Sequence, residues 1–199
     1  MGNRLNVFVG SGGGDVSGTS AETTRSRGTT TEAPLSSEEC RLLSSFWRGT
    51  LAADDHFFPE TIAVMAAKAP VVQQILGIED LSSAATNPHV EKLSQRVHQF
   101  FKDVLSADNA VLESNTAFAV KFGQLGGRHV DYKIKPCYWD MLVAAMEEVL
   151  RERRSVSEEG LRVWLKFMKR VVAIMTKGYE ESRAHRAQLE NGSARKDSD

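Results

Sequence analysis

The 199-residue sequence has few of the features that mark secreted, membrane-spanning or metal-cluster proteins. It contains only two cysteines, Cys40 and Cys137, which is too few for a disulfide framework and lacks the spacing of a Cys/His metal site. No run approaches the ~18 apolar residues of a membrane span, and the N-terminus lacks the basic start and apolar core of a secretory signal. These absences predict a reducing, cytoplasmic setting.

Acidic and basic residues are also nearly equal in number. The 25 basic and 26 acidic residues leave a formal net charge of −1, which favours no nucleic acid and no acidic substrate as a partner. The sequence holds no pattern typical of a Ser/His/Asp triad or of paired catalytic carboxylates, so we do not expect an enzyme. Residues 35–180 show no convincing period-two alternation, which disfavours strands.

The N-terminal segment is poor in side chains that could form a core. Residues 10–31 contain 16 Ser, Thr or Gly out of 22, so burial could not offset the entropy of ordering them. We therefore expect a flexible leader over residues 1–34. The stretch NVFVGSGGGD could suggest a strand entering a dinucleotide loop, but Asp15 stands where the last glycine belongs and low complexity follows.

The first residues also allow a lipid modification. Removal of Met1 would expose Gly2 for N-myristoylation, although Asn6 stands where Ser or Thr is usual, and a plain disordered start is the alternative. A single acyl chain on Gly2 would give only weak membrane association, because stable anchoring needs a second signal.

From residue 35 onward, apolar residues recur at three- and four-residue spacing, which predicts helices. Ser36 followed by Glu39 is typical of a helix start, and either Ser155 or Ser157 would cap the last helix. Four prolines stand at expected helix starts, namely Pro59, Pro70, Pro88 and Pro136. The prediction is one all-α domain over residues 35–180, with about seven to eight helices, followed by a polar tail over 181–199 that frays.

The order of these helices resembles the globin family. LSSEECRLLSSFW is similar to the family's first helix, Pro70 to the proline of its short third helix, and NPHVEKLSQRV to the start of its distal helix. LGGRH followed by KIKP and an aromatic residue resembles the turn that carries the iron ligand, and WLKFMKRVVAIMTKGY resembles the last helix. The likeness is to a divergent globin of the kind found in invertebrates such as nematodes, which implies haem b as cofactor.

The resemblance implies that His129 is the proximal ligand of the haem iron. An imidazole on a helix end can point at the metal from a fixed backbone, and Gly126 and Gly127 would let the helix loosen so that the ring reaches it. The alternative, a surface histidine after a helix cap, is disfavoured by the matching helices on both sides. Other residues expected to contact haem on this side are Leu125, Ile134 and Trp139, the last of which could equally be plain core.

The distal side departs from the family's pattern. Counting from Asn87-Pro88 places Leu93 where a distal histidine is usual, with Val97 one turn on and Arg96 between them. Leucine cannot donate a hydrogen bond to bound oxygen, which costs on the order of 1–3 kcal/mol. Oxygen would then leave quickly unless Arg96 swings in as a donor, although an arginine there is more commonly solvated or paired with a haem propionate.

Three further residues bear on the pocket. Leu76 stands where globins usually press a phenylalanine on haem, so haem would be held less tightly. His89 or His98 could supply a sixth iron ligand only if the helix register differs from this one. We expect His98, which lies about 140° round the helix from Leu93, to be partly buried or on the surface.

These features together imply a haem-binding globin that takes up O2, CO or NO, exchanges electrons with a donor or acceptor, or does both. The apolar distal residues, the leader and an acyl group on Gly2 would suit sensing or redox signalling in the cytoplasm or on the cytoplasmic face of a membrane. Any redox turnover would be a side activity of haem. The alternative is a haem-less globin-fold module that acts through protein contacts, which Leu93 and Leu76 favour and His129 opposes.

Overall fold

The computed structural model describes residues 33–105, 110–132 and 134–194, and these residues form helices and no strand. The elements are α1 (Ser37–Phe46), the π-helical turn η1 (Trp47–Leu51), α2 (Phe57–Lys68), α3 (Pro70–Leu76), the 3-10 turn η2 (Leu81–Thr86), α4 (Pro88–Leu105), α5 (Ala110–Glu113), α6 (Asn115–Arg128), α7 (Pro136–Arg153) and α8 (Glu158–Ala194). The predicted all-α fold is confirmed. Residues 1–32 of the expected leader, Gly2 included, lie outside the described residues.

The sequence marks several helix starts correctly. At the start of α1 the backbone N–H of Glu39 donates to Ser36 Oγ at 3.2 Å, and that of Ser36 donates to Glu39 Oε2 at 2.9 Å, which completes a capping box. Of the two serines considered for α8, Ser157 is the cap, because its Oγ accepts from the Gly160 backbone N–H at 3.1 Å.

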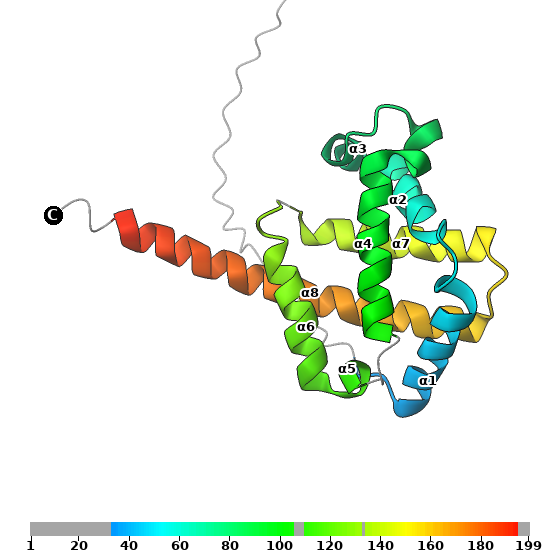
Figure 1. Cartoon of the computed structure of the whole chain (residues 1–199). Helices are drawn as coiled ribbons and strands as arrows, with labels where there is room; N and C mark the ends of the chain where they lie inside the picture. The colour runs from blue at the N-terminus through cyan, green and yellow to red at the C-terminus, as the bar shows by residue number, and fades with distance from the viewer. Residues whose placement is uncertain (1–32, 106–109, 133, 195–199) are drawn as a thin grey trace, which may run out of the picture.

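The helices cross one another around an aromatic core. Figure 1 shows α7 and α8 side by side and antiparallel, α4 in front of them, and α6 crossing α8 on the side away from α1 and α2. Trp47 and Trp164 stack with ring centroids 6.3 Å apart, and Phe101 of α4 lies 5.6 Å from Trp164. Burial of these large side chains drives the folding of the domain.

A second, smaller core joins α2, α3, η2 and α4. Its buried members are Ile62, Ala66, Ala69, Val72, Ile78, Ala84 and Val90. Leu76 and Leu93 are partly buried against it. The helix α4 therefore packs into both cores, which fixes the orientation of its remaining face.

The last helix differs from the prediction. The expected fraying tail after residue 180 instead continues α8 as one helix to Ala194, and Figure 1 shows this end projecting from the body. The helix continues because residues 181–190 lack an apolar stripe yet are rich in good helix formers, and because Arg186 pairs with Asp131. Within the described ranges, no helix is long and apolar enough to span a bilayer.

Candidate functional site

His129 occupies the C-cap of α6, where the chain leaves the helix. Its backbone N–H donates to Gly126 O at 3.0 Å, and its own carbonyl accepts from the backbone N–H of Tyr132 at 3.2 Å and of Ile134 at 3.4 Å. These bonds close a tight turn directly after the helix. The backbone of His129 is therefore held on both sides.

The imidazole of His129 has a defined hydrogen bond. Its Nδ1 lies 2.7 Å from the carbonyl oxygen of Leu125, and because a carbonyl can only accept, Nδ1 carries the proton. In the neutral ring Nε2 is then the unprotonated nitrogen. This is the arrangement of a metal-ligating histidine, whose second nitrogen commonly donates to a carbonyl that fixes the tautomer.

Aromatic side chains fix the plane of the same ring. Trp139 of α7, which is 6% exposed, meets His129 edge-on, with centroids 5.4 Å apart and an interplanar angle of 86°. Tyr179 of α8 packs edge-on behind Trp139 at 6.0 Å, and the exposed Tyr132 lies 6.0 Å from His129 on the turn. The orientation of the imidazole thus depends on α7 and α8 as well as on α6.

The glycines before His129 do not have the predicted effect. Gly126 and Gly127 do not loosen α6, which remains helical through Arg128. They allow close packing instead, because a Cβ on Gly126 would lie 2.0 Å from the backbone oxygen of Met175 and one on Gly127 would lie 2.5 Å from Ser182 Oγ. Gly178 likewise approaches the backbone of Gly123. The prediction was wrong because sequence alone does not show which helix crosses α6.

The helices α4 and α6 turn matching faces toward each other. Phe100 of α4 and Phe122 of α6 contact with ring centroids 5.6 Å apart. The two helices run in opposite directions in Figure 1. Helical spacing of three and four residues places Leu93 and Val97 on the Phe100 side of α4 and Leu125 and His129 on the Phe122 side of α6.

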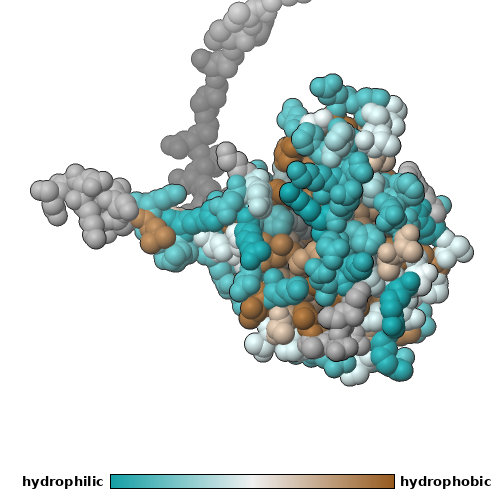
Figure 2. Space-filling view, viewed as in Figure 1, coloured by the Kyte–Doolittle hydropathy of each residue, from teal (hydrophilic) through white to brown (hydrophobic). Residues whose placement is uncertain are grey.

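We call Leu93, Val97, Phe100, Leu125 and His129 the interhelix face. All five side chains are only partly buried, although four are apolar. Figure 2 shows hydrophobic side chains at the surface between α6 and α4. This combination of incompletely covered apolar side chains and one imidazole on two facing helices is typical of a site for a flat apolar group.

Other predicted site residues lie around this face. Ile134 is partly buried on the turn after His129, and Leu76 packs with Leu93 against the smaller core. Arg96 is exposed, and the described part of the chain provides it with no ion-pair partner. The structure thus places Arg96 on α4 without bringing it to another charged group.

The two alternative histidines lie elsewhere. His89 is exposed on the first turn of α4. His98 is partly buried between Trp47 at 5.4 Å and Phe58 at 5.8 Å, on the side of α4 that faces η1 and α2. The expectation of a partly buried His98 is confirmed.

The residues present fit haem in two respects. The tautomer of His129 leaves Nε2 as an electron-pair donor for iron, and the interhelix face supplies apolar surface for a porphyrin. The described residues contain no group of three or more His, Cys, Asp and Glu side chains that could bind a metal ion. A single imidazole is therefore the metal donor that this face offers.

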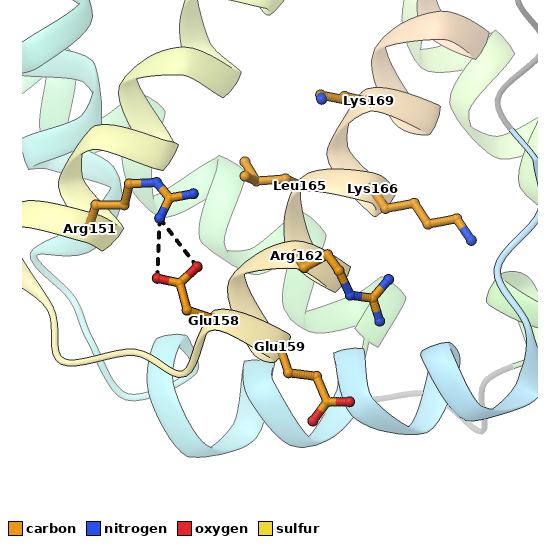
Figure 3. Close-up of a pocket in the computed structure, with 7 residues that line it drawn as sticks. All are labelled: Arg151, Glu158, Glu159, Arg162, Leu165, Lys166 and Lys169. Atoms are coloured by element: carbon orange, nitrogen blue, oxygen red, sulfur yellow. Dashed lines mark hydrogen bonds and ion pairs between the residues drawn. The ribbon is translucent and has the colours of Figure 1, made fainter.

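An open groove between the end of α7 and the start of α8 has a different character (Figure 3). Its lining is mostly charged, and consists of Arg151, Glu158, Glu159, Arg162, Leu165, Lys166 and Lys169. Carboxylates pair with most of its cations, as in the contacts of Arg151 with Glu158 and of Lys166 with Glu39. This lining lacks both an imidazole and a broad apolar wall, so it does not suit haem.

Sequence reasoning missed the support that α8 gives to the site. Neither Tyr179 behind Trp139 nor the ion pair between Arg186 and Asp131 was foreseen. A usable indication was present in the small residues at positions 123, 126 and 127, since glycines at helical spacing often mark a close helix crossing. The partner helix could not be identified from that spacing.

Comparison with protein families gives one match that covers more than half of the chain. The family model described as Globin matches residues 60–175, from the first turn of α2 to the middle of α8. This range includes His129 and the whole interhelix face. A comparison with curated proteins finds no match.

Proposed function

Because this chain belongs to the globin family, we propose that it binds haem b through His129 and takes up a diatomic gas, O2, CO or NO, or exchanges electrons. The observation that carries the proposal is the hydrogen bond from His129 Nδ1 to Leu125 O, which leaves Nε2 as a donor beside an apolar face. When bound, haem supplies an iron that binds diatomic ligands reversibly and changes its redox state.

The protein side of this function is binding and orientation. His129 would hold the metal, while the carbonyl of Leu125 and the edge of Trp139 keep its ring in one plane. Leu125, Ile134 and Val97 supply apolar surface and exclude water from the site. We assign no catalytic residue, and any redox turnover would be a side activity.

The distal residues tune the proposed function. Leu93 and Val97 cannot donate hydrogen bonds, so a polarised ligand such as oxygen would be bound weakly. The affinity for a less polarised ligand such as CO would be reduced less. Arg96 is exposed, which supports a solvated role or a contact with a haem propionate. A site of this polarity suits sensing or redox signalling better than oxygen storage.

We further propose a cytoplasmic setting, with weak association to the cytoplasmic face of a membrane if Gly2 is acylated. The support is the Met1-Gly2 start of the sequence, and this segment lies outside the described residues. Labelling cells with a clickable myristate analogue would test it, since Gly2→Ala should abolish incorporation. Label that persists in Gly2→Ala would exclude this site.

A haem-less interaction module is the second candidate. It is favoured by Leu76 and Leu93, which depart from the family's pattern and are already partly buried against the smaller core. In this case the interhelix face would bind protein rather than porphyrin. The defined tautomer of His129 has no role in that alternative.

The visible absorption spectrum of the purified protein, produced with haem supply and reduced under nitrogen, tests the first candidate. We expect a haem spectrum in the wild type and loss of haem from His129→Gly, with retention falling about tenfold or more because the axial bond is gone. Added imidazole should restore the spectrum of His129→Gly by replacing the missing ring.

The control is His98→Gln, which removes an imidazole from the other side of α4 and should keep the wild-type spectrum. One broad visible band would indicate five-coordinate iron, and two sharp bands would indicate an internal sixth ligand. A wild type that takes up no haem would favour the interaction module instead.

A further inference from the structure

The last part of α8 packs along the segment that carries His129. Met175 lies against Gly126, Gly178 against Gly123, Ser182 against Gly127, and Arg186 pairs with Asp131. The four α8 residues at positions 175, 178, 182 and 186 are spaced by three or four, so they form one stripe along the helix. This stripe continues beyond the end of α6 to the turn that follows His129.

The stripe extends past residue 175, where the match to the family ends. Figure 1 shows α8 passing the end of α6 and projecting from the body. Residues 181–194 form helix without an apolar core of their own, and Ser182 and Arg186 connect them to Gly127 and Asp131. The end of α8 is thus held to the rest of the described chain through the residues on either side of His129.

A second link joins α8 to the imidazole. Tyr179 packs edge-on against Trp139 at 6.0 Å, and Trp139 packs edge-on against His129 at 5.4 Å. Tyr179 is one residue from Gly178 on the stripe, so a displacement of the helix end would move the ring behind Trp139. One link thus restrains the backbone after His129 and the other restrains its ring.

We propose that the end of α8, residues 179–190, is a strut that sets the position of His129, with Arg186 and Tyr179 as positioning residues. The part that concerns iron rests on the proposed haem function. Anything that pulls this helix end from the turn would change how the imidazole meets the metal.

The ion pair is suited to this role because it can be broken without unfolding the protein. Arg186 Nη1 lies 2.5 Å from Asp131 Oδ1, and the two side chains are 44% and 60% exposed. An exposed pair of this kind is modest in strength and is screened by salt.

Amide hydrogen exchange on the haem-free protein tests the strut without any use of iron. Arg186→Gln and Asp131→Asn should each speed exchange in residues 127–132 about two- to fivefold, as expected for loss of one exposed ion pair. The double variant should be no faster than either single variant. Lys177→Gln is the matched control, because it removes an exposed pair with Glu181 on the same helix and should leave residues 127–132 unchanged.

Resonance Raman spectroscopy of the haem-loaded protein tests the effect on the metal. The iron–imidazole stretching band should shift in the same direction in Arg186→Gln, in Asp131→Asn and in wild type at high salt, while Lys177→Gln keeps the wild-type band. Tyr179→Leu should shift the band through Trp139, an effect that mere loss of stability would not produce.

Exchange at residues 127–132 that is the same in Arg186→Gln and wild type would overturn the strut. Additive effects of the two single variants would also overturn it, because they would show that Arg186 and Asp131 do not act on each other. Faster exchange with an unmoved iron–imidazole band would overturn the role toward His129. A wild type that binds no haem would overturn the proposed function, and the exchange comparison would still decide whether the strut exists.

Discussion

The two sides of the interhelix face are built differently. On the α6 side, His129 is held by the carbonyl of Leu125, by the edge of Trp139 and by backbone bonds of the following turn. On the α4 side, Leu93 and Val97 present aliphatic groups that make no directional bonds, and Arg96 points its charge into solvent. The structure therefore holds the imidazole of His129 in a defined orientation and presents aliphatic side chains on the opposite side.

The contrast agrees with the proposed haem site. Ligation requires one nitrogen in one tautomer and one direction, so several helices restrain the ring. The opposite side determines ligand preference, and a single substitution there can change it. Packing variants should consequently damage the α6 side most, and polarity variants should act on the α4 side.

The largest effect should come from Gly126→Ala. Its Cβ would meet the backbone oxygen of Met175 at 2.0 Å, so α6 must move from α8 and we expect a loss of about 2–3 kcal/mol in the free energy of unfolding. Chemical denaturation measures this change. Gly123→Ala on the same helix has nothing within 4 Å of its Cβ and should be neutral or stabilising by about 0.5–1 kcal/mol. Equal effects of the two substitutions would contradict the close crossing.

Leu93→Gln should have the next largest effect, and it should act on ligand binding. An amide on this side could donate a hydrogen bond to oxygen, which should slow oxygen dissociation about 5- to 100-fold. Stopped-flow measurement on the haem-loaded protein reads this rate. Leu93→Met changes shape without adding a donor and should stay close to wild type. An unchanged rate in Leu93→Gln would mean that residue 93 lies outside the ligand's reach.

Acid should weaken the contact between α1 and α8 by protonating Glu39. Because α8 packs against α6, the α6 side of the site should become less stable as well. Lys166 at 2.6 Å, together with the backbone of Ser36 and with Arg162, lowers the pKa of Glu39 from 4.5 to about 2. Because the pKa of Glu39 is lower in the folded protein than in the unfolded chain, the ionised carboxylate stabilises the fold at any pH above the unfolded pKa. This stability is lost as pH falls from about 4.5 to about 2.

Glu39→Gln should therefore cost about 1–2 kcal/mol at neutral pH, since the side chain of Glu39 is 13% exposed and its carboxylate pairs with Lys166 of α8. Unfolding curves at several pH values would show the difference between Glu39→Gln and wild type shrinking below pH 4.5 and vanishing near pH 2. Glu38→Gln is the control, because within the part of the chain that the structure describes Glu38 pairs with its exposed neighbour Arg41 alone. A pH-independent difference for Glu39→Gln would refute the electrostatic explanation.

The smallest effect should come from Arg96→Gln. Because Arg96 is exposed, its removal should change the oxygen dissociation rate by less than about twofold. Tenfold faster dissociation of oxygen from Arg96→Gln would show that Arg96 moves toward the bound ligand. The α4 side would then be more polar than the exposed position of Arg96 in the structure indicates.

Local patterns predicted much of the fold because they depend on neighbouring residues in the chain. The Ser36 and Glu39 capping box, the proline at the start of α7 and the apolar periodicity of α4 all specify helices through contacts within about one turn. The position of His129 at a helix end could be predicted for the same reason. The family resemblance supplied the proposed role of His129 as iron ligand, which spacing alone would not provide.

Contacts between distant segments could not be predicted in this way. Gly126 and Gly127 were expected to loosen α6, yet they pack against Met175 and Ser182 of a helix about fifty residues away. The polar end of α8 was expected to fray, yet it remains helical and reaches Asp131. Both differences arose because a small or polar residue does not reveal its partner.

The sequence by itself therefore determined an all-α chain with a histidine just after a helix that ends near Gly126 and Gly127, since helix capping, proline placement and apolar periodicity act over short distances. Only the tertiary structure decided how that histidine is held. Its tautomer, the ring behind it and the helix that restrains its turn depend on α6, α7 and α8 meeting at one place, and long-range packing brings those helices together.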